Sequence, residues 1–326
     1  MRKIYSVGTA TLDIFFVFDN LKFFNNKKYL KEKNEVEKCF IDIGGGGLNF
    51  AYVFKKLNLD TEAIVKIGND FIGKIIKKKV QEKNLPCHFI LAKGNSTLSF
   101  IFLDKKGDKY IFTYRGQEIF KEKDIPIYKN SAYYIAPGRT DIKIWYKIIK
   151  KLKKEENILA INPSSFFLKQ DFYNVIHVLS EVDFLILNID ELKFFISKKF
   201  KIKGIKDIKL IENFRELFPK PKIIIITSGY KGSWILFKEN LYFSEAYHKF
   251  PVIDTTGAGD SYGSTFFGFI IKKDFKIDEN YLKKISKYAS INTASNLTKI
   301  GAQTGILSEN QIKRLKYSHI KFLKIW

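Results

Sequence analysis

Cysteine is scarce in this chain of 326 residues, which contains only Cys39 and Cys87. Two isolated cysteines provide neither a disulfide framework nor a C-x-x-C metal site, so the sequence fits a reducing cytoplasm. Long apolar runs are also missing, because no stretch approaches the ~18 uninterrupted apolar residues that span a bilayer. Residues Met1–Gly8 are too short and too mixed for a signal peptide and predict a first strand. We therefore expect a cytoplasmic protein that has no membrane partner.

Arginine is nearly absent from a strongly basic sequence. The net charge is +23, yet arginine occurs only at positions 2, 115, 139, 215 and 314 among 57 basic residues. Surfaces that read nucleic acids rely on arginine forks, whereas the many lysines of this chain are spread over nearly every predicted helix. We interpret most of these lysines as solvated helix faces that also attract anionic substrates. A nucleic-acid partner is therefore not expected.

Apolar strands that alternate with helices are abundant. Strands are predicted at Ile4–Val7, Ala63–Ile67, Ala132–Ile135, Leu159–Ile161, Phe184–Leu187 and Ile223–Thr227. Helices are predicted at Asn49–Leu57, Ile72–Glu82, Ile142–Lys154 and Glu191–Lys199, and after Gly257 at Ala258–Ile271, Glu279–Leu297 and Glu309–Lys316. This alternation is typical of an α/β fold in which helices cover both faces of a mostly parallel sheet. We predict a single domain over residues 1–326.

Two regions interrupt the alternation. Residues Phe15–Ile43 and Ser96–Tyr114 contain short alternating strands and turns, which predict a small sheet inserted into the main domain at about 14–43 and 95–116. A small sheet at the mouth of a domain is suited to be a lid that excludes water during group transfer. An exposed lid edge could also pair with a second copy, which predicts a homodimer through the lid.

The most informative segment is Asp254-Thr-Thr-Gly-Ala-Gly-Asp260, followed by an apolar run from Tyr262 to Ile271. Gly257 and Gly259 can take backbone angles closed to other residues, so successive N–H groups can converge on one point. A helix that begins here adds partial positive charge, which completes an anion site and should keep Asp260 ionised. An anion site beside a carboxylate is what phosphoryl transfer requires. The alternative is an Asx turn and N-cap ahead of a buried helix.

Further candidates lie at the carboxyl ends of predicted strands, where open α/β sheets bind their ligands. Asp13 follows the first strand, and Gly44-Gly45-Gly46-Gly47-Leu48-Asn49 opens a helix whose Asn49 could bind the hydroxyls of a polyol. Later in the chain, Asn188 and Glu191 suit a Mg²⁺ water shell or a phosphate contact. Thr227-Ser-Gly229-Tyr-Lys-Gly232 gives a second glycine turn. The structural alternatives are a hydrogen-bonding aspartate, a helix cap at Asn188 and a hairpin at Gly232.

Two other glycine patterns are interpreted as structural. Gly68-Asn-Asp-Phe-Ile-Gly73-Lys74 has the spacing of a P-loop, but the next residue is Ile75, which cannot hold Mg²⁺ as Ser or Thr would. We predict a strand-to-helix turn there. The Gly44–Gly47 run lacks the third glycine of a dinucleotide fingerprint, so a nicotinamide enzyme is not expected.

Taken in order, these motifs resemble the ribokinase-like, or PfkB, family of carbohydrate and nucleoside kinases. The resemblance rests on Gly44-Gly45-x-x-x-Asn49-x-Ala51, Gly68-x-Asp70-x-x-Gly73, Asn188-x-x-Glu191, Thr227-x-Gly229-x-x-Gly232 and Asp254-Thr-Thr-Gly-Ala-Gly-Asp260, and it extends from Asp13 to about Gly305. It implies a three-layer α/β/α domain with a β-sheet lid. It also implies ATP with Mg²⁺ as phosphoryl donor and a hydroxyl of a small sugar or a nucleoside as acceptor.

The resemblance implies a role for each motif. Asp260 matches the family's base, and Gly257, Ala258 and Gly259 match its anion hole. The remaining matches are Asp13, Gly44, Gly45 and Asn49 for the acceptor site, Asn188 and Glu191 for the motif that organises phosphate and water-bound Mg²⁺, and Thr227, Gly229 and Gly232 for the nucleotide site. Many members also bind a monovalent cation such as K⁺ near the anion hole, and Asp254 and Thr256 match two of its ligands.

Departures from the family pattern leave the acceptor open. Gly46 stands where ribokinases typically carry Lys, residues 162–165 lack the D-x-N-x-R pattern common among fructokinases, and Ser290 replaces an Asn that many relatives place beside adenine. Arg115 and Arg139 are candidate acceptor contacts, with ordinary ion pairs as the alternative. A ribose- or fructose-like sugar is the first hypothesis. A nucleoside is the second, favoured by lid phenylalanines at positions 15, 16, 102 and 112 that could stack on a base, and a non-catalytic binding module is the third.

Overall fold

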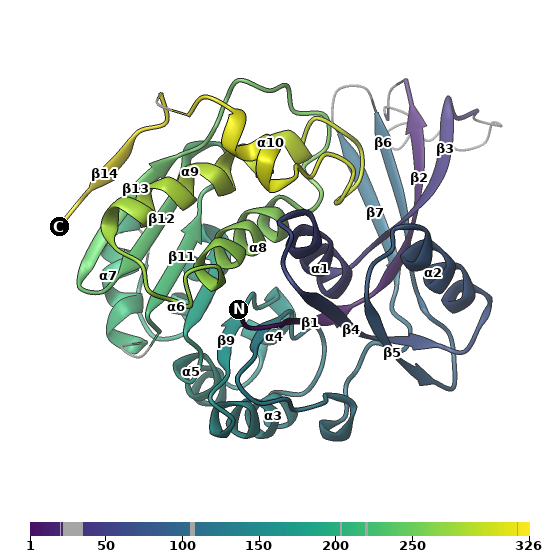
Figure 1. Cartoon of the computed structure of the whole chain (residues 1–326), viewed down its shortest axis with the longest axis horizontal. Coiled ribbons are helices and arrows are strands. Elements are labelled where there is room, and N and C mark those ends of the chain that lie inside the picture. Colours follow the sequence, from purple (N-terminus) through teal and green to yellow (C-terminus); the bar gives the residue numbers. More distant parts are fainter. Residues whose placement is uncertain (20, 22–34, 105–107, 203, 219–220, 318) are drawn as a thin grey trace.

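A ten-stranded sheet forms the centre of the molecule (Figure 1). The structure, a computed structural model, describes residues 1–326 except 20, 22–34, 105–107, 203, 219–220 and 318. The strand order is β14-β13-β12-β11-β10-β9-β8-β1-β4-β5, with parallel neighbours from β11 to β5. The parallel strands are β1 (Ile4–Thr9), β4 (Thr61–Gly68), β5 (Cys87–Ala92), β8 (Ala132–Ile135), β9 (Ile158–Ile161), β10 (Phe184–Asn188) and β11 (Ile223–Thr227). The antiparallel strands are β12 (Gly232–Phe237), β13 (Asn240–Glu245) and β14 (Phe322–Lys324).

Helices cover both faces of this sheet, which confirms the predicted three-layer α/β/α architecture. One face packs against α3 (Ile142–Lys154), α4 (Ser165–Lys169), α5 (Phe172–Ser180), α6 (Ile189–Ser197) and α7 (Asp207–Leu217). The other packs against α1 (Gly46–Lys56), α2 (Phe71–Glu82), α8 (Ala258–Ile271), α9 (Glu279–Asn296) and α10 (Glu309–Arg314). Because the central strands are buried on both faces, they consist of nearly continuous apolar residues, as in the sequence IIIIT of β11.

Small residues bring α8 close to the sheet. The helix is buried along most of its length, and a Cβ added to Gly263 would lie only 2.2 Å from the Tyr134 hydroxyl oxygen on β8. Tyr134 is next to the last residue of β8, so the start of α8 lies near the carboxyl edge of the sheet, where ligands of open α/β sheets bind.

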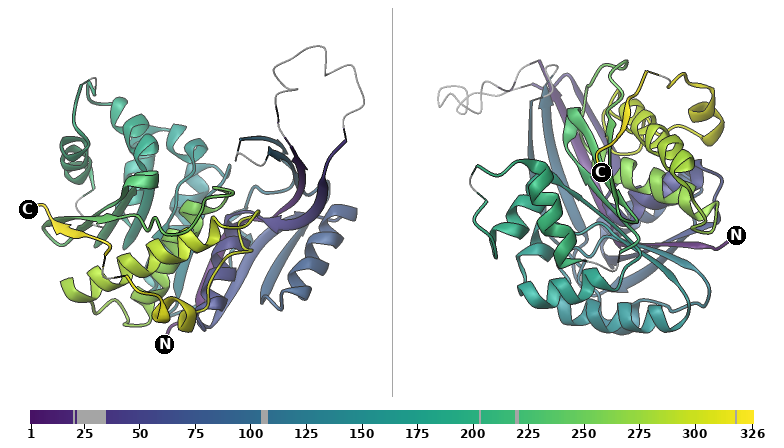
Figure 2. Two further views of the ribbon diagram at one scale, coloured as in Figure 1. Left: turned by 90° about the horizontal axis from the view of Figure 1, so that it is seen from above. Right: turned by 90° about the vertical axis from the view of Figure 1, so that its left-hand side faces the viewer.

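A second, four-stranded sheet projects from the large one (Figure 2). Its order is β3-β2-β6-β7, with bounds β2 (Thr11–Phe18), β3 (Lys38–Gly44), β6 (Thr97–Asp104) and β7 (Lys109–Tyr114). The sequence predicts this sheet from about residue 14, whereas it begins at Thr11 because only Ala10 separates β2 from β1. Within the predicted lid segments, residues 20, 22–34 and 105–107 lie outside the described part of the chain.

The predicted bounds agree best for the central strands and for two of the helices. Helices α3 and α8 and strands β8 and β11 have the predicted bounds. Strands β5, β12 and β13 were not predicted. Strand β5 is partly exposed at the sheet edge. Strands β12 and β13 form a hairpin that begins at Gly232, which is the structural alternative predicted for that residue. Strand β14 adds a short extended segment after the last helix. No helix in the described part of the chain is long and apolar enough to cross a membrane.

The segment with P-loop spacing is a strand-to-helix turn, as predicted. Strand β4 ends at Gly68, and the Asp70 carboxylate caps α2 by accepting a 2.8 Å hydrogen bond from the Gly73 N–H. A Cβ on Gly73 would lie 2.3 Å from the Gly68 carbonyl oxygen, so the glycine is required for a close backbone approach.

Candidate active site

The N-terminus of α8 is built around a left-handed glycine. Gly257 has φ 74° and precedes the helix without providing a side-chain cap, which leaves N–H groups of the first turn for another partner. A Cβ at Gly257 would lie 2.7 Å from the Ala302 Cβ, so both conformation and space require glycine. Gly259 differs from the expectation, because it has no positive φ and a Cβ there would meet open space. The missing side chain at Gly259 leaves space next to the first turn of α8, but the conformation of the turn does not require glycine at this position.

Asp260 lies in the first turn of α8 and takes part in a short hydrogen-bond chain. Its Oδ2 accepts a 2.8 Å hydrogen bond from Asn49 Nδ2, and Asn49 Oδ1 accepts one of 3.0 Å from Gln303 Nε2. Burial raises the pKa of Asp260 above its ordinary value, and the hydrogen bond from Asn49 opposes that shift. The helix terminus favours the ionised form of Asp260, as predicted, whereas burial of the side chain favours the protonated form.

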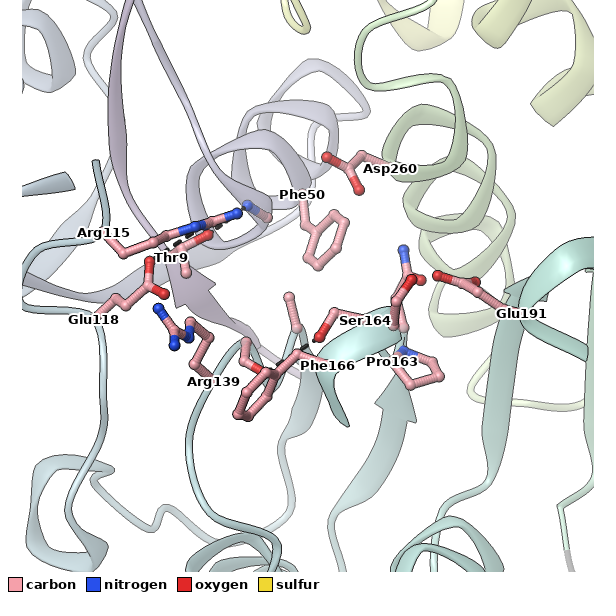
Figure 3. A pocket seen from close by; sticks show the side chains of 15 residues that line it. Thr9, Phe50, Arg115, Glu118, Arg139, Pro163, Ser164, Phe166, Glu191 and Asp260 are labelled. Atoms are coloured by element: carbon pink, nitrogen blue, oxygen red, sulfur yellow. Dashed lines mark hydrogen bonds and ion pairs between the residues drawn. The ribbon is translucent and has the colours of Figure 1, made fainter. Parts of the chain in front are cut away.

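A cavity of about 580 Å³ opens in front of Asp260 (Figure 3). Figure 3 shows Asp260 and Glu191 on one side of it, and Arg115, Glu118 and Arg139 on the other. Its lining residues are Thr9, Gly46, Phe50, Arg115, Glu118, Ala136, Gly138, Arg139, Asn162, Pro163, Ser164, Ser165, Phe166, Glu191 and Asp260. The two arginines are held differently: Arg115 lies 3.4 Å from Glu118 Oε2, whereas the Arg139 guanidinium lies 5.3 Å from the Phe166 ring centroid. The ion-pair alternative is thus confirmed for Arg115, and because both arginines line the cavity, the acceptor contact stays a prediction for both.

The residues predicted for the acceptor site lie in two places. Asn49 contacts Asp260, but Asp13, Gly44 and Gly45 are not among the described residues that line the first cavity. Asp13 is buried on β2 opposite β3, where a Cβ on Gly44 would lie 2.1 Å from its Oδ2. Burial and the neighbouring carboxylate of Asp42 raise the pKa of Asp13 to about 7. These three residues lie where the small sheet joins the large one.

A second cavity, of about 440 Å³, lies on the other side of the α8 N-terminus. It contains all three residues predicted for the nucleotide site, Thr227, Gly229 and Gly232. The rest of its lining is Tyr230, Ala246, Tyr247, His248, Phe250, Val252, Thr255, Ala258, Gly259, Tyr262, Ser290, Thr293, Ala294 and Leu297. Because Asp260 lines the first cavity and Ala258 and Gly259 line the second, the first turn of α8 separates the two.

Asn188 and Glu191 form a reciprocal capping box at the start of α6. The Asn188 Oδ1 accepts from the Glu191 N–H at 2.8 Å, and Glu191 Oε2 accepts from the Asn188 N–H at 2.9 Å. The structural alternative predicted for Asn188 is therefore confirmed. Glu191 also lines the first cavity, and burial raises its pKa to about 7, although the hydrogen bond from Asn188 opposes this. One carboxylate at a cavity wall fits a contact to Mg²⁺ through water, and the described residues contain no cluster of three acidic, His or Cys side chains that could bind a metal directly.

Asp254 and Thr256, the residues predicted to bind a monovalent cation, contact a lysine of the small sheet. Lys109 Nζ lies 3.1 Å from Asp254 Oδ1 and 3.0 Å from Thr256 Oγ1. The other carboxylate oxygen of Asp254 accepts a 3.0 Å hydrogen bond from the Gly301 N–H. Lys109 was not predicted, because one lysine among so many carries no signal in the sequence. Gln303 was also missed, since it belongs to none of the motifs.

Known proteins resemble this chain over most of its length. The family described as "pfkB family carbohydrate kinase" matches residues 1–309. The chain is 26% identical to a ribokinase of Dictyostelium discoideum, covering 95% of this chain and 99% of that protein. It is 24% identical to a nucleoside kinase of Methanocaldococcus jannaschii, covering 83% and 84%.

Solved structures share the fold. A ribokinase from Giardia lamblia superposes with a TM-score of 0.80 at 17% identity over 96% of this chain and 99% of that one. The nucleoside kinase of Methanocaldococcus jannaschii superposes with a TM-score of 0.75 at 22% identity over 96% and 97%. Both ribokinases and nucleoside kinases are thus among the similar proteins, which agrees with a phosphotransferase of sugars or nucleosides. Since the family match covers nearly the whole length, the chain belongs to the pfkB family of carbohydrate kinases.

Proposed function

We propose that this protein transfers the γ-phosphoryl group of ATP to a hydroxyl of a small, ribose- or fructose-like sugar. The observation that carries the proposal is the position of the α8 first turn between two cavities, with Asp260 on one and Gly259 on the other. A donor in the second cavity and an acceptor in the first would meet at a helix N-terminus, where partial positive charge favours a phosphoryl group.

Asp260 is the proposed general base. As the acceptor oxygen attacks the γ-phosphorus, its proton passes to the Asp260 carboxylate, the new P–O bond forms, and the bond to the β-phosphate oxygen breaks to release ADP. The first-turn N–H groups that follow Gly257 stabilise the negative charge on the transferring group. Asn49, held by Gln303, keeps the carboxylate in one orientation. Mg²⁺, when bound, neutralises phosphate charge, and Glu191 is the side chain we assign to it, through water.

The second cavity suits a nucleotide. Its apolar and aromatic side chains, among them Tyr247 and Phe250, provide a surface for a base, while the glycines at 229 and 232 allow close backbone approach. Ser290 lies in this cavity and accepts a 2.7 Å hydrogen bond from the Tyr247 N–H, so its hydroxyl supports the lining backbone.

A sugar is favoured over a nucleoside by the arrangement of the lid phenylalanines. Phe15 stacks on Phe40 at 4.8 Å, Phe16 stacks on Phe102 at 5.2 Å, and Phe102 contacts Phe112 edge-on at 5.8 Å. None of them lines the described first cavity. These four phenylalanines therefore contact other rings of the small sheet and not the described first cavity. The similarity to nucleoside kinases keeps the nucleoside as the second candidate.

An ATP-consumption screen over free sugars, phosphosugars and nucleosides tests the proposal. We expect the highest kcat/KM for a free sugar. The highest value for a nucleoside would replace the proposed acceptor but keep the proposed chemistry. ATP binding without turnover on any acceptor would contradict the kinase assignment and favour a binding module.

A further inference from the structure

Lys109 connects the small sheet to the loop that leads into α8. It is the first residue of β7, and its Nζ contacts three oxygens 145 to 147 residues further along the chain: Asp254 Oδ1 at 3.1 Å, Thr255 Oγ1 at 3.1 Å and Thr256 Oγ1 at 3.0 Å. An ammonium group has three N–H donors, so these three acceptors can satisfy it completely. The loop is therefore bound at three successive residues by one charged group.

The Asp254 carboxylate needs such a partner. Its side chain is only 2% exposed, and a buried carboxylate is costly unless it is paired with positive charge and hydrogen-bonded. Both oxygens are in use, because Oδ1 also accepts from the N–H and hydroxyl of Thr256 and Oδ2 accepts from the Gly301 N–H. Burial alone would raise the pKa of Asp254, but these hydrogen bonds and the Lys109 ammonium hold it below its ordinary value.

The family resemblance assigns two of these residues, Asp254 and Thr256, to a monovalent cation. Carboxylate and hydroxyl oxygens are the type of ligand that a hard cation prefers. In this chain, however, Asp254 Oδ1 and Thr256 Oγ1 already contact the Lys109 ammonium. A free cation on Asp254 Oδ1 would lie against a second positive charge, and that oxygen already accepts from Lys109 Nζ and from the N–H and hydroxyl of Thr256. The residues present therefore do not fit a free monovalent cation while Lys109 is bound.

We infer that the Lys109 ammonium group replaces the monovalent cation. Because Lys109 belongs to the small sheet, the conformation of the loop at residues 254–257 then depends on that sheet. The positive charge next to Thr256 belongs to strand β7 and not to the solvent. The loop that it binds runs directly into Gly257, so Lys109 acts as a positioning residue for the first turn of α8. This inference rests on the proposed kinase function for its activity readout only.

The wild-type protein provides the first test. We expect the same Tm in KCl and in tetramethylammonium chloride at equal ionic strength, because Lys109 already supplies the charge. A Tm that rises saturably with K⁺ in the wild type would overturn the inference. This measurement needs no substrate, so it is independent of whether the proposed acceptor is correct.

Lys109→Met provides the second test, since methionine keeps the length of the side chain but removes its charge. We expect a Tm lower than that of the wild type by roughly 2–4 °C and faster amide exchange in residues 254–260, both partly restored by KCl and not by tetramethylammonium chloride. Turnover should become K⁺-dependent in parallel. Lys38→Met is the matched control, because Lys38 begins an edge strand of the same sheet and is exposed. A Lys109→Met protein that matches this control, or whose losses K⁺ does not restore, would reduce the contact to an ordinary ion pair and overturn the inference.

Discussion

Asn49 Nδ2 donates a 2.8 Å hydrogen bond to Asp260 Oδ2 across 211 residues of sequence. Both residues lie near the N-termini of their helices, α1 and α8, which pack side by side. The amide of Asn49 cannot rotate freely, because Gln303 Nε2 donates to its other end at 3.0 Å. The orientation of the proposed base is therefore set by two neutral side chains from separate parts of the chain.

Replacing the proposed base should abolish turnover without abolishing nucleotide binding. In Asp260→Asn the proton acceptor is lost, and removal of a general base typically costs about 10²–10⁴-fold in rate. The second cavity does not contain the Asp260 side chain, so ATP affinity measured by calorimetry should stay close to that of the wild type. A kcat within about tenfold of the wild type would exclude Asp260 as the base.

Gln303→Leu should impair catalysis through Asn49. Gln303 is buried, and the change leaves Asn49 Oδ1 without its donor, so we expect kcat to fall by about tenfold, equivalent to the ~1.4 kcal/mol of one hydrogen bond. Because the hydrogen bond from Asn49 lowers the pKa of Asp260, a disordered Asn49 should move the acidic limb of the kcat/KM profile to higher pH. A lower Tm with an unmoved pH profile would assign Gln303 a structural role only.

Asp13 should make the protein less stable as the pH rises. Its pKa is about 7 in the folded protein and about 4 when unfolded, so between these values the folded state binds an additional proton. Stability is therefore lost as pH rises through that interval. Asp13→Asn removes this pH dependence. The Tm of the variant minus the Tm of the wild type should therefore be larger at pH 8 than at pH 5. Since Glu191 titrates in the same range in both proteins, the difference between them isolates Asp13. An equal Tm difference at both pH values would contradict the assignment.

Arg139 should contribute to acceptor binding. It lines the first cavity and makes no ion pair with any described residue, whereas Arg115 is paired with Glu118. Because hydrogen bonds to charged groups contribute about 1.5–3 kcal/mol, Arg139→Met should raise KM for the acceptor by roughly 10- to 100-fold and leave KM for ATP unchanged. Arg314→Met, an exposed change in α10, is the control. Equal KM values in both variants would remove Arg139 from the site.

The edge of the small sheet should mediate a homodimer. Strand β7 exposes Ile111, Phe112 and Tyr114 to 49%, 54% and 53%, which is a large apolar edge for a single copy. We expect light scattering to give the mass of a dimer for the wild type and of a monomer for Phe112→Lys. A monomeric wild type at micromolar concentration would contradict the prediction.

The sequence predicted the centre of the fold well because burial on both faces imposes continuous apolar strands. For β11, α3 and α8 the apolar pattern and the flanking residues determine the bounds. Strand β5 escaped prediction because its half-exposed residues give no clear period, and β12 and β13 because their pairing is set by contact with each other.

The candidate site was predictable where its residues belong to one segment, and not where they meet only after folding. Thr227, Gly229 and Gly232 line one cavity together because they end one strand and begin the next. Asp13 was predicted for the acceptor site through the family resemblance, and this stays a prediction, because the residue lies buried on β2 at the sheet junction and is not among the described residues that line the first cavity. The contacts of Lys109 and Gln303 span 145 and 254 residues, and no local pattern marks either one.

The single residue between β1 and β2 has a mechanical consequence. Only Ala10 separates β1 from β2, and only Gly45, at φ 90°, separates β3 from α1, so two connections between the small sheet and the main domain are single residues. Asp13 and Gly44 lie on paired strands of the small sheet and Asp260 lies on α8, so a change in the angle between the sheets would shift Asp13 and Gly44 together relative to Asp260. The two single-residue connections therefore make the position of Asp13 and Gly44 depend on the angle between the two sheets.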